Sequence, residues 1–253
     1  MKRIITLTTD FGAEDHYVGS MKGVILGINR NSVIVDITHN INNHNIFNAA
    51  LNAQNFYKYF PNNSIHVVVV DPGVGSLRKP IAVQSEHGIF IGPDNGVFSL
   101  ILEQDQKASV YEITNSEYML DNVSNTFHGR DIFAPAAAHI SLGIDIASIG
   151  MKVDSPIILN ITKPVVNDDE IVGEVVYTDH FGNLTTNIPS NIIGNPREIH
   201  LDGYIIDTVA KSYQDVEIGK LLAIIGSSGF LEISVNQGRA ADVIKSRKII
   251  VKK

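Results

Sequence analysis

The chain has 253 residues, with 20 lysines and arginines against 27 aspartates and glutamates, which gives a net charge of −7. It has no cysteine, so disulfides, zinc–thiolate sites and a cysteine nucleophile are excluded. Its basic residues are scattered, and no apolar run approaches the ~18 residues of a membrane span. Since the N-terminus also lacks the pattern of a signal peptide, we expect a soluble, cytoplasmic protein with no nucleic-acid or membrane partner.

The first half of the chain alternates between two hydrophobic periods. Short β-branched runs predict strands, and apolar residues at a 3.6-residue spacing predict helices. The strands are expected at 4–9, 33–37, 65–70, 81–83 and 89–91, and the helices at 17–28, 46–59, 97–102 and 132–142. Because strands alternate with helices, we expect a layered α/β domain with a central sheet.

The second half has a different pattern, which begins after Pro164. Short strand-like runs are separated by Gly, Pro and Asn, and they are expected at 171–177, 184–187, 198–201, 204–209, 221–225, 231–235 and 248–251. Strands at this spacing suggest a small sandwich or barrel. A polar break at 162–170 places the boundary, so we expect an α/β domain over 1–165 and a smaller all-β domain over 166–253.

Polar residues collect where the predicted strands end, which is where open α/β sheets bind ligands. Asp10 follows the first strand, and its carboxylate could bind a sugar cis-diol or could simply lead a turn into the next helix. Asp71 and Arg78 bracket a loop that contains Gly73 and Gly75, as an ion pair would. The loop lacks the spacing of a phosphate-binding loop. The other possibility is a tight loop with a surface salt bridge of at most about 1 kcal/mol.

His128 lies just before a predicted helix and could be a general base, because its unperturbed pKa of about 6.5 is near working pH. We expect Asp131 to cap or charge the start of that helix. The remaining histidines are not at metal-ligand spacing, so we expect neither a metal nor another cofactor. No G-x-S-x-G elbow follows a strand, which argues against a serine hydrolase.

In the β-rich half, Asp179 could bind an ammonium, Phe181 could stack on a heteroaromatic ring, and Asn183 could pair with a base edge. Ser227 lies in a glycine-flanked turn that could offer backbone N–H groups to a carboxylate. Both segments could instead be ordinary turns between strands.

Six motifs occur in order along the chain: Thr9-Asp10-Phe11-Gly12, Asp36-Ile37-Thr38-His39, Asp71-Pro72-Gly73-Val74-Gly75, Pro93-Asp94-Asn95-Gly96, the run from Phe127 to Pro135, and Phe181-Gly182-Asn183. In this combination the chain resembles the S-adenosyl-L-methionine hydroxide adenosyltransferase family, relatives of the bacterial fluorinase and chlorinase. The resemblance implies hydrolysis of S-adenosyl-L-methionine to adenosine and L-methionine. It also implies a C-terminal β-barrel-like domain and a homotrimer with active sites shared between subunits.

The resemblance also implies roles for individual residues. Asp71, Arg78 and His128 would activate water. Asp10 would bind the ribose diol. At the methionine end, Asp15 would lie near the carboxylate, Asp179 would bind the ammonium, and Ser227 would lie close by, with Glu232 in the strand that follows it. The adenine would be surrounded by Phe181, Asn183, Tyr213 and the backbone near Asn236.

Two other functions stay open. One is a halogenase that transfers a halide to C5′, and the other is a binding protein that holds the ligand without cleaving it. The fluorinase has a long insertion where this chain has only residues 79–92, and it has no counterpart of Asp71 or His128. These departures argue against a halide pocket. With no thiolate and no metal cluster expected, water activation would depend on Asp71, Arg78 and His128.

Overall fold

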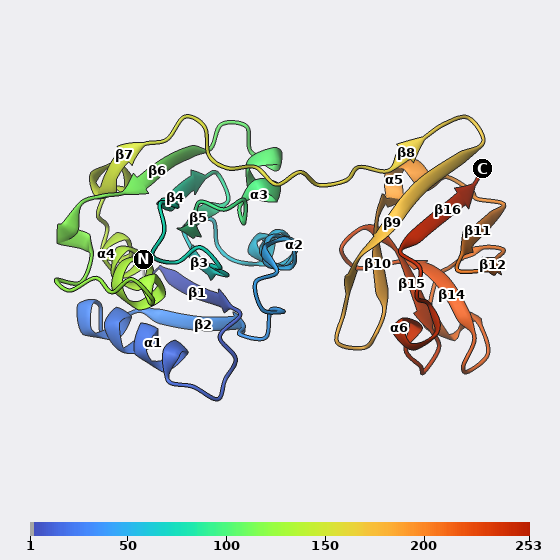
Figure 1. The fold of residues 1–253 in the computed structure, drawn as a ribbon, viewed down its shortest axis with the longest axis horizontal. Coiled ribbons are helices and arrows are strands. Elements are labelled where there is room, and N and C mark those ends of the chain that lie inside the picture. The colour runs from blue at the N-terminus through green and yellow to red at the C-terminus, as the bar shows by residue number, and fades with distance from the viewer. Residues whose placement is uncertain (1–2) are drawn as a thin grey trace. The chain divides into compact units, whose positions relative to one another are not determined.

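The computed structural model describes residues 3–253, and their contacts divide the chain into two units (Figure 1). The first unit ends at Leu159 and the second comprises Asn160–Lys253. The boundary expected between residues 165 and 166 lies a few residues further along the chain. Among residues 3–253, no helix has both the length and the apolar character needed to cross a membrane.

The first unit is built on one seven-stranded sheet. In spatial order its strands are β2 (Val33–Thr38), β1 (Ile4–Thr9), β3 (Ile65–Val69), β5 (Gly88–Pro93), β4 (Pro80–Ser85), β6 (Ser109–Ile113) and β7 (Gly150–Lys152). The pairs β2–β1, β1–β3 and β3–β5 are parallel, and the pairs from β5 to β7 are antiparallel. The strands β6 and β7 were not predicted, because both are short and have no clear apolar alternation.

Helices cover both faces of this sheet, as the predicted α/β layering requires. The helix α1 (Tyr17–Ile28) packs with α4 (Ala134–Ser141), and α2 (Ile46–Phe56) packs with α3 (Ser99–Gln104). The bounds predicted for α1 are confirmed. The remaining helical turns are η1 (Tyr57–Tyr59), η2 (Ser116–Tyr118), the π-helical η3 (Gly129–Phe133) and η4 (Ile146–Ile149).

The central strand β3 shows why the sequence forms this layer. All five of its residues are buried, as expected for a parallel strand covered on both faces. Val67 and Val69 belong to the core formed with α1 and α4, whereas Val68 and the following Val70 belong to the core formed with α2 and α3. Alternate side chains therefore attach both helical layers to one strand.

The second unit is a β-domain whose curled sheet is close to a barrel. Its strands are β8 (Val165–Val166), β9 (Glu170–Thr178), β10 (Leu184–Pro189), β11 (Glu198–Leu201), β12 (Tyr204–Ile206), β13 (Val209–Ala210), β14 (Leu221–Ile225), β15 (Phe230–Val235) and β16 (Lys248–Lys252). Two single-turn helices, α5 (Ser190–Ile193) and α6 (Ala240–Val243), and the turn η5 (Tyr213–Asp215) are added to it. The α/β and β-barrel-like fold class is confirmed.

The prediction of one strand over 204–209 is wrong, and the difference explains the curled shape. The segment bends at residues 207–208, so that β12 pairs with β11 and β13 pairs with β14. These pairings lie at opposite ends of the strand order β12-β11-β16-β9-β10-β15-β14-β13. One short segment therefore links the two edges of the sheet.

A buried histidine makes the first unit sensitive to acid. The ring of His66, on β3, is completely buried among Phe56, Phe60 and Phe90. Its Nδ1 shares a hydrogen bond of 2.9 Å with Thr6 Oγ1, and its Nε2 has no partner. Because burial disfavours the charged ring, the pKa of His66 falls to about 4.

We therefore expect the free energy of unfolding to fall by about 2 kcal/mol between pH 7 and pH 5 on account of His66. Over this range the unfolded chain, with a histidine pKa near 6.5, binds a proton that the folded chain does not. Urea unfolding at the two pH values measures the difference. The variant His66→Leu should lose this contribution, while removal of the exposed His180 by His180→Asn should leave it intact. Equal pH dependence in wild type and His66→Leu would contradict the assignment.

Candidate active site

The site of the first unit lies at one edge of its sheet. Because β1, β2, β3 and β5 are parallel, the residues that follow them lie at the same edge. These residues include Asp10 after β1, His39 after β2, Asp71 after β3 and Asn95 after β5. The chain also places β2 and β3 on opposite sides of β1, and open α/β sheets bind ligands at such a change of direction.

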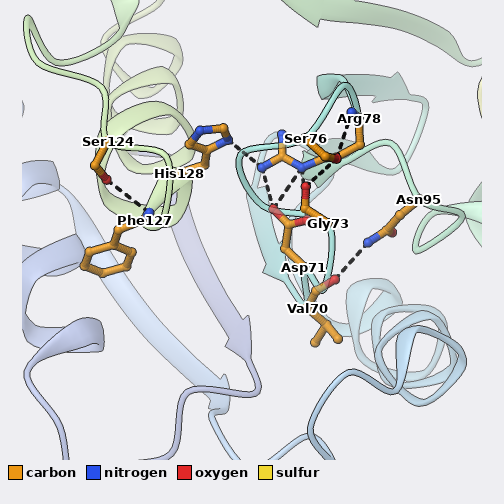
Figure 2. A network of polar contacts seen from close by, with 9 residues as sticks. All are labelled: Val70, Asp71, Gly73, Ser76, Arg78, Asn95, Ser124, Phe127 and His128. Atoms are coloured by element: carbon orange, nitrogen blue, oxygen red, sulfur yellow. Dashed lines mark hydrogen bonds and ion pairs between the residues drawn. The ribbon is translucent and has the colours of Figure 1, made fainter.

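Asp71, Arg78 and His128 form a continuous chain of hydrogen bonds at this edge (Figure 2). Arg78 Nε donates to both oxygens of Asp71 at 3.0 and 2.9 Å, and Arg78 Nη2 donates to Asp71 Oδ2 at 2.5 Å. The same Nη2 lies 2.6 Å from Nδ1 of His128. The structure thus brings together the three residues that the resemblance implied for water activation.

The Asp71–Arg78 pair is not the surface salt bridge that remained possible from the sequence. The two side chains are only 5% and 7% exposed. A buried ion pair is costly unless its remaining donors and acceptors are satisfied. Arg78 Nη1 is buried without a hydrogen-bond partner, so this guanidinium has an N–H donor available for an oxygen atom that enters the site.

The contact with Arg78 determines the protonation state of His128. Arginine has only donors, so Nδ1 of His128 must accept, and the neutral ring carries its proton on Nε2. Burial and the positive charge of Arg78 lower the pKa of His128 below 6.5, while Asp71, Asp131 and a hydrogen bond with the Ser124 backbone oppose the shift. His128 is therefore neutral near pH 7, and its Nδ1 lone pair is already in use.

Two neighbouring polar residues support this arrangement. Asn95 Nδ2 donates to the carbonyl of Val70 at 2.9 Å, which fixes the backbone immediately before Asp71 (Figure 2). Ser76 Oγ donates to the carbonyl of Gly73 at 2.7 Å and holds the loop between the members of the ion pair. The sequence contained Asn95 in a motif but gave no reason to assign it a role, because its partner is a backbone atom from another strand.

The segment before His128 is held by a second ion pair, whose carboxylate is buried. Asp131 is fully buried and accepts hydrogen bonds from Arg130, from the Ser124 backbone at 2.8 Å and from Ser124 Oγ at 2.7 Å. Asp131 lies in the first turn of η3, but no side chain caps that turn. Asp131 therefore places a negative charge in the first turn, as one half of the prediction stated, but it does not cap the turn, because its carboxylate accepts hydrogen bonds from the preceding loop.

The two other acidic residues predicted in the first unit lie in the segment between β1 and α1. Asp10 Oδ2 accepts a hydrogen bond of 3.0 Å from the His44 backbone. Asp15 is exposed in the turn before α1. No contact joins either of them to the Asp71–Arg78–His128 chain among the hydrogen bonds of residues 3–253.

A second group of predicted residues lies on the second unit. In the turn between β9 and β10, Asp179 accepts hydrogen bonds from the backbone and the side-chain amide of Asn183, at 2.8 and 3.0 Å. These contacts leave Asn183 Oδ1 as an acceptor. Phe181, in the same turn, is 71% exposed, and its ring contacts the His180 ring edge to face.

Tyr213 and Glu232 belong to the same group. The Tyr213 hydroxyl donates to Glu232 Oε1 at 2.9 Å, and Ser234 Oγ donates to the same oxygen. Burial, Glu232 and the negative charge of Asp179 raise the pKa of Tyr213 to about 12, so the phenol stays protonated and remains a donor.

Ser227 and Asn236 lie apart from these hydrogen bonds. Ser227 is exposed in the turn between β14 and β15. Asn236 is buried, its Nδ2 donates to Val216, and its backbone pairs with Gly219 and Lys220. The groups of Asn236 are thus used in holding the 216–220 loop.

Neither group of residues includes a metal site. Over residues 3–253, no cluster of three or more His, Cys, Asp or Glu side chains could hold a metal ion. A cavity of about 770 Å³ in the second unit is lined by residues from β12, β13 and β14 and contains none of the predicted site residues.

Comparison with known proteins covers both units. Residues 5–150 match the model of the SAM hydroxide adenosyltransferase N-terminal domain, and residues 173–248 match that of its C-terminal domain. A protein from Methanocaldococcus jannaschii named (R)-S-adenosyl-L-methionine hydrolase is 36% identical over 95% of this chain and 91% of its own. One of the same name from Salinispora tropica is 34% identical over 95% and 93%.

A fluorinase from Nocardia brasiliensis is 24% identical, over 94% of this chain and 92% of its own. Among solved structures, an uncharacterized conserved protein from Thermotoga maritima is similar with a TM-score of 0.92 and 38% identity. That similarity covers 98% of this chain and all of the other.

The state of His128 can be tested by ¹⁵N NMR of the imidazole. At pH 7 we expect the neutral form with the proton on Nε2, and titration should give a pKa below 6.5. Arg78→Met removes a positive charge and should raise this pKa. Asp71→Asn removes a negative charge and should lower it further. Shifts of the same sign in both variants would contradict the arrangement.

The loop of the ion pair should not tolerate a side chain at Gly75. This residue has φ of +75°, and a Cβ there would lie 2.2 Å from the carbonyl oxygen of Asn125. Gly143 has φ of +104° and open space around it, so it is a matched control. We expect Gly143→Ala to cost about 1–2 kcal/mol from backbone strain alone. Gly75→Ala should cost more in urea unfolding and should also shift the His128 NMR signals; equal effects would contradict the close packing.

Proposed function

The chain belongs to the SAM hydroxide adenosyltransferase family, and we propose that Asp71, Arg78 and His128 activate the water with which it hydrolyses S-adenosyl-L-methionine. The protein is an enzyme of the hydrolase class, with S-adenosyl-L-methionine as its substrate and adenosine and L-methionine as the products that fit the family. Residues of this chain suit both the substitution step and the parts of the substrate.

The observation that supports this assignment is the buried guanidinium of Arg78. Its Nη1 donor has no partner, and the carboxylate of Asp71 lies against the other side of the same group. A water molecule beside them would donate a proton toward Asp71 and accept a hydrogen bond from Arg78. The two charges would orient one lone pair of the water toward the substrate.

The chemistry requires only one substitution step. The water oxygen forms a bond to C5′ of the ribose, and the C5′–sulfur bond breaks with its electron pair remaining on the sulfur of methionine. One proton leaves the water, so that the 5′-hydroxyl of adenosine forms. The sulfonium is a good leaving group, and a nucleophile held in line behind C5′ can supply up to about 7–11 kcal/mol through proximity and orientation.

The hydrogen bonds favour Asp71 as the group that takes the proton. His128 has its Nδ1 occupied by Arg78 and its proton on Nε2, so it has no lone pair free for water. We assign His128 the role of holding Arg78 Nη2 in place. This role of His128 is narrower than the role considered from the sequence, in which His128 could be a general base.

The other predicted residues suit the parts of the substrate. We propose that Asp10 accepts hydrogen bonds from the ribose hydroxyls, using the oxygen that His44 does not occupy. Phe181 and the free Oδ1 of Asn183 suit the ring face and the exocyclic amine of adenine. Asp179 and Glu232 are carboxylates that suit an ammonium group. Tyr213, Asp15, Ser227 and Asn236 stay predictions, as do the homotrimer with shared active sites and the cytoplasmic location.

A halogenase is the second candidate function, because fluorinases are among the relatives. The hydrolases are the more similar ones, at 34–36% identity against 24%. A buried carboxylate at the nucleophile's position also disfavours a halide, because two anions would then share one desolvated site.

Incubation of the purified protein with S-adenosyl-L-methionine in ¹⁸O-water, followed by mass spectrometry, tests the reaction. We expect adenosine labelled at the 5′-oxygen and unlabelled methionine. Methylthioadenosine with homoserine lactone would indicate spontaneous decay alone. Formation of a 5′-halo-adenosine in added chloride or fluoride would identify a halogenase, and unchanged substrate would identify a binding protein.

Asp71→Asn should lower kcat by about 10²–10⁴-fold with little change in KM, because it removes the proton acceptor and keeps the shape. His128→Asn should keep much more activity than His128→Ala, since the Asn Oδ1 can take the place of Nδ1 as acceptor for Arg78. As a control, Glu112→Gln removes a carboxylate that pairs with Lys79 on the surface and should leave kcat unchanged. Equal loss in His128→Asn and His128→Ala would show that the imidazole itself transfers a proton.

A further inference from the structure

We propose that Thr9, His39 and Asp36 form a positioning network that sets the orientation of Asp10 toward the ribose of the substrate. The inference depends on the proposed function, in which Asp10 binds the ribose hydroxyls. Among the hydrogen bonds of residues 3–253, none joins these three residues to the Asp71–Arg78–His128 chain, so their role is separate from water activation.

The three residues are joined in a row. Thr9 Oγ1 lies 2.9 Å from Nδ1 of His39, and Nε2 of His39 lies 3.2 Å from Asp36 Oδ1. At the outer end, Lys22 Nζ on α1 donates to Asp36 Oδ2 at 2.5 Å. Asp36 has its pKa lowered: burial opposes the shift, but the hydrogen bond and positive charge of Lys22, with the nearby His39 ring, outweigh it. The row therefore ends on an ionised carboxylate.

Thr9 Oγ1 makes two of the contacts in this row. It accepts a hydrogen bond of 3.2 Å from the Phe11 backbone N–H, and its hydrogen and second lone pair remain for the contact with His39 Nδ1. Nε2 of His39 is buried 3.2 Å from Asp36 Oδ1 without the geometry of a hydrogen bond, so the ring faces the carboxylate at close range.

The network holds the loop around Asp10 from both sides. Thr9 is fully buried at the end of β1 and binds Phe11 through its side chain. His39 binds Gly12 through its backbone carbonyl, which accepts from the Gly12 N–H at 2.8 Å. Asp10 lies between these anchored positions, so its carboxylate direction depends on the residues on either side.

An irregularity in the sheet makes this contact possible. Along the parallel pair β1–β2, Leu7 lies opposite Asp36, but Thr8 lies opposite Thr38, so that Ile37 is skipped. The extra residue advances the end of β2 by one position relative to β1. His39 therefore reaches Thr9, and Asp36 stays within reach of the His39 ring. Such irregularities often re-aim side chains next to active sites.

Thr9 and Thr8 offer a matched pair of variants for the test. Both are fully buried in β1, but Thr8 Oγ1 has no hydrogen-bond partner, whereas Thr9 Oγ1 has two. Valine has the shape of threonine without the hydroxyl. Thr9→Val should thus break the network, Thr9→Ser should preserve it, and Thr8→Val should leave it untouched.

The measurements are kcat and KM for S-adenosyl-L-methionine and for its 2′-deoxy and 3′-deoxy ribose analogues. We expect Thr9→Val and His39→Leu to raise KM for the natural substrate about 5–10-fold, which corresponds to one or two lost hydrogen bonds, with kcat changed less than about twofold. The preference for the natural substrate over the deoxy analogues should shrink by a similar factor. Thr9→Ser and Thr8→Val should keep both values of the wild type.

A double variant separates positioning from general loosening. If Thr9 acts through Asp10, Thr9→Val should add little to the KM effect of Asp10→Asn. Three results would overturn this inference without affecting the ribose assignment. They are fully additive effects of the two substitutions, a wild-type KM in Thr9→Val, and a raised KM in Thr9→Val with the ribose preference intact. An Asp10→Asn variant with wild-type KM and ribose preference would overturn both this inference and the ribose assignment. Neither result would affect the ¹⁸O test of hydrolysis.

Discussion

A guanidinium removed from water must find acceptors for its N–H groups, and the site of the first unit is organised around this constraint. Two nitrogens of Arg78, Nε and Nη2, donate to Asp71, and Nη2 also donates to His128. Only Nη1 is buried without a partner. A buried ion pair of this kind contributes little to stability, because desolvation offsets most of the attraction. In the proposed mechanism the pair provides water with a buried donor, Arg78 Nη1, and a buried acceptor, Asp71, both held in place.

The sheet makes this arrangement stiff. Asp71 follows β3, the strand whose side chains belong to both helical layers, so its backbone is anchored on two faces. Asn95 adds a hydrogen bond from the neighbouring strand end, and close packing of Gly75 against Asn125 holds the loop to the segment that carries His128. An active-site group placed on rigid elements keeps its geometry without help from the substrate.

A second, separate network of polar side chains lies at the same edge of the sheet. The row from Lys22 through Asp36 and His39 to Thr9 crosses from the surface to the core and ends at the loop of Asp10. Water activation and ribose binding are thus assigned to neighbouring strand ends, each with its own polar support. Parallel strands allow this, because their carboxyl ends lie at one edge of the sheet, while the residues that hold each site residue in place come from different loops.

Much of the fold could be predicted from the sequence, because apolar periodicity is a local property. The helix Tyr17–Ile28 and the strand Ile4–Thr9 have the bounds that their patterns indicated. The strands β6 and β7 were missed, since both are short and neither has a clear apolar alternation. The segment 204–209 was predicted as one strand, because its bend depends on pairing with β11 on one side and β14 on the other.

For the site, the sequence by itself determined which chemical groups are available: carboxylates, one arginine and one histidine, without thiolates. Their order also indicated the family. Only the tertiary structure decided that Arg78 bridges Asp71 and His128, that the pair is buried, and that the Nδ1 lone pair of His128 accepts a hydrogen bond from Arg78. The reason is physical. Protonation and desolvation depend on neighbouring side chains, and Arg78 and His128 are 50 residues apart in the chain, so the local sequence pattern does not indicate their contact.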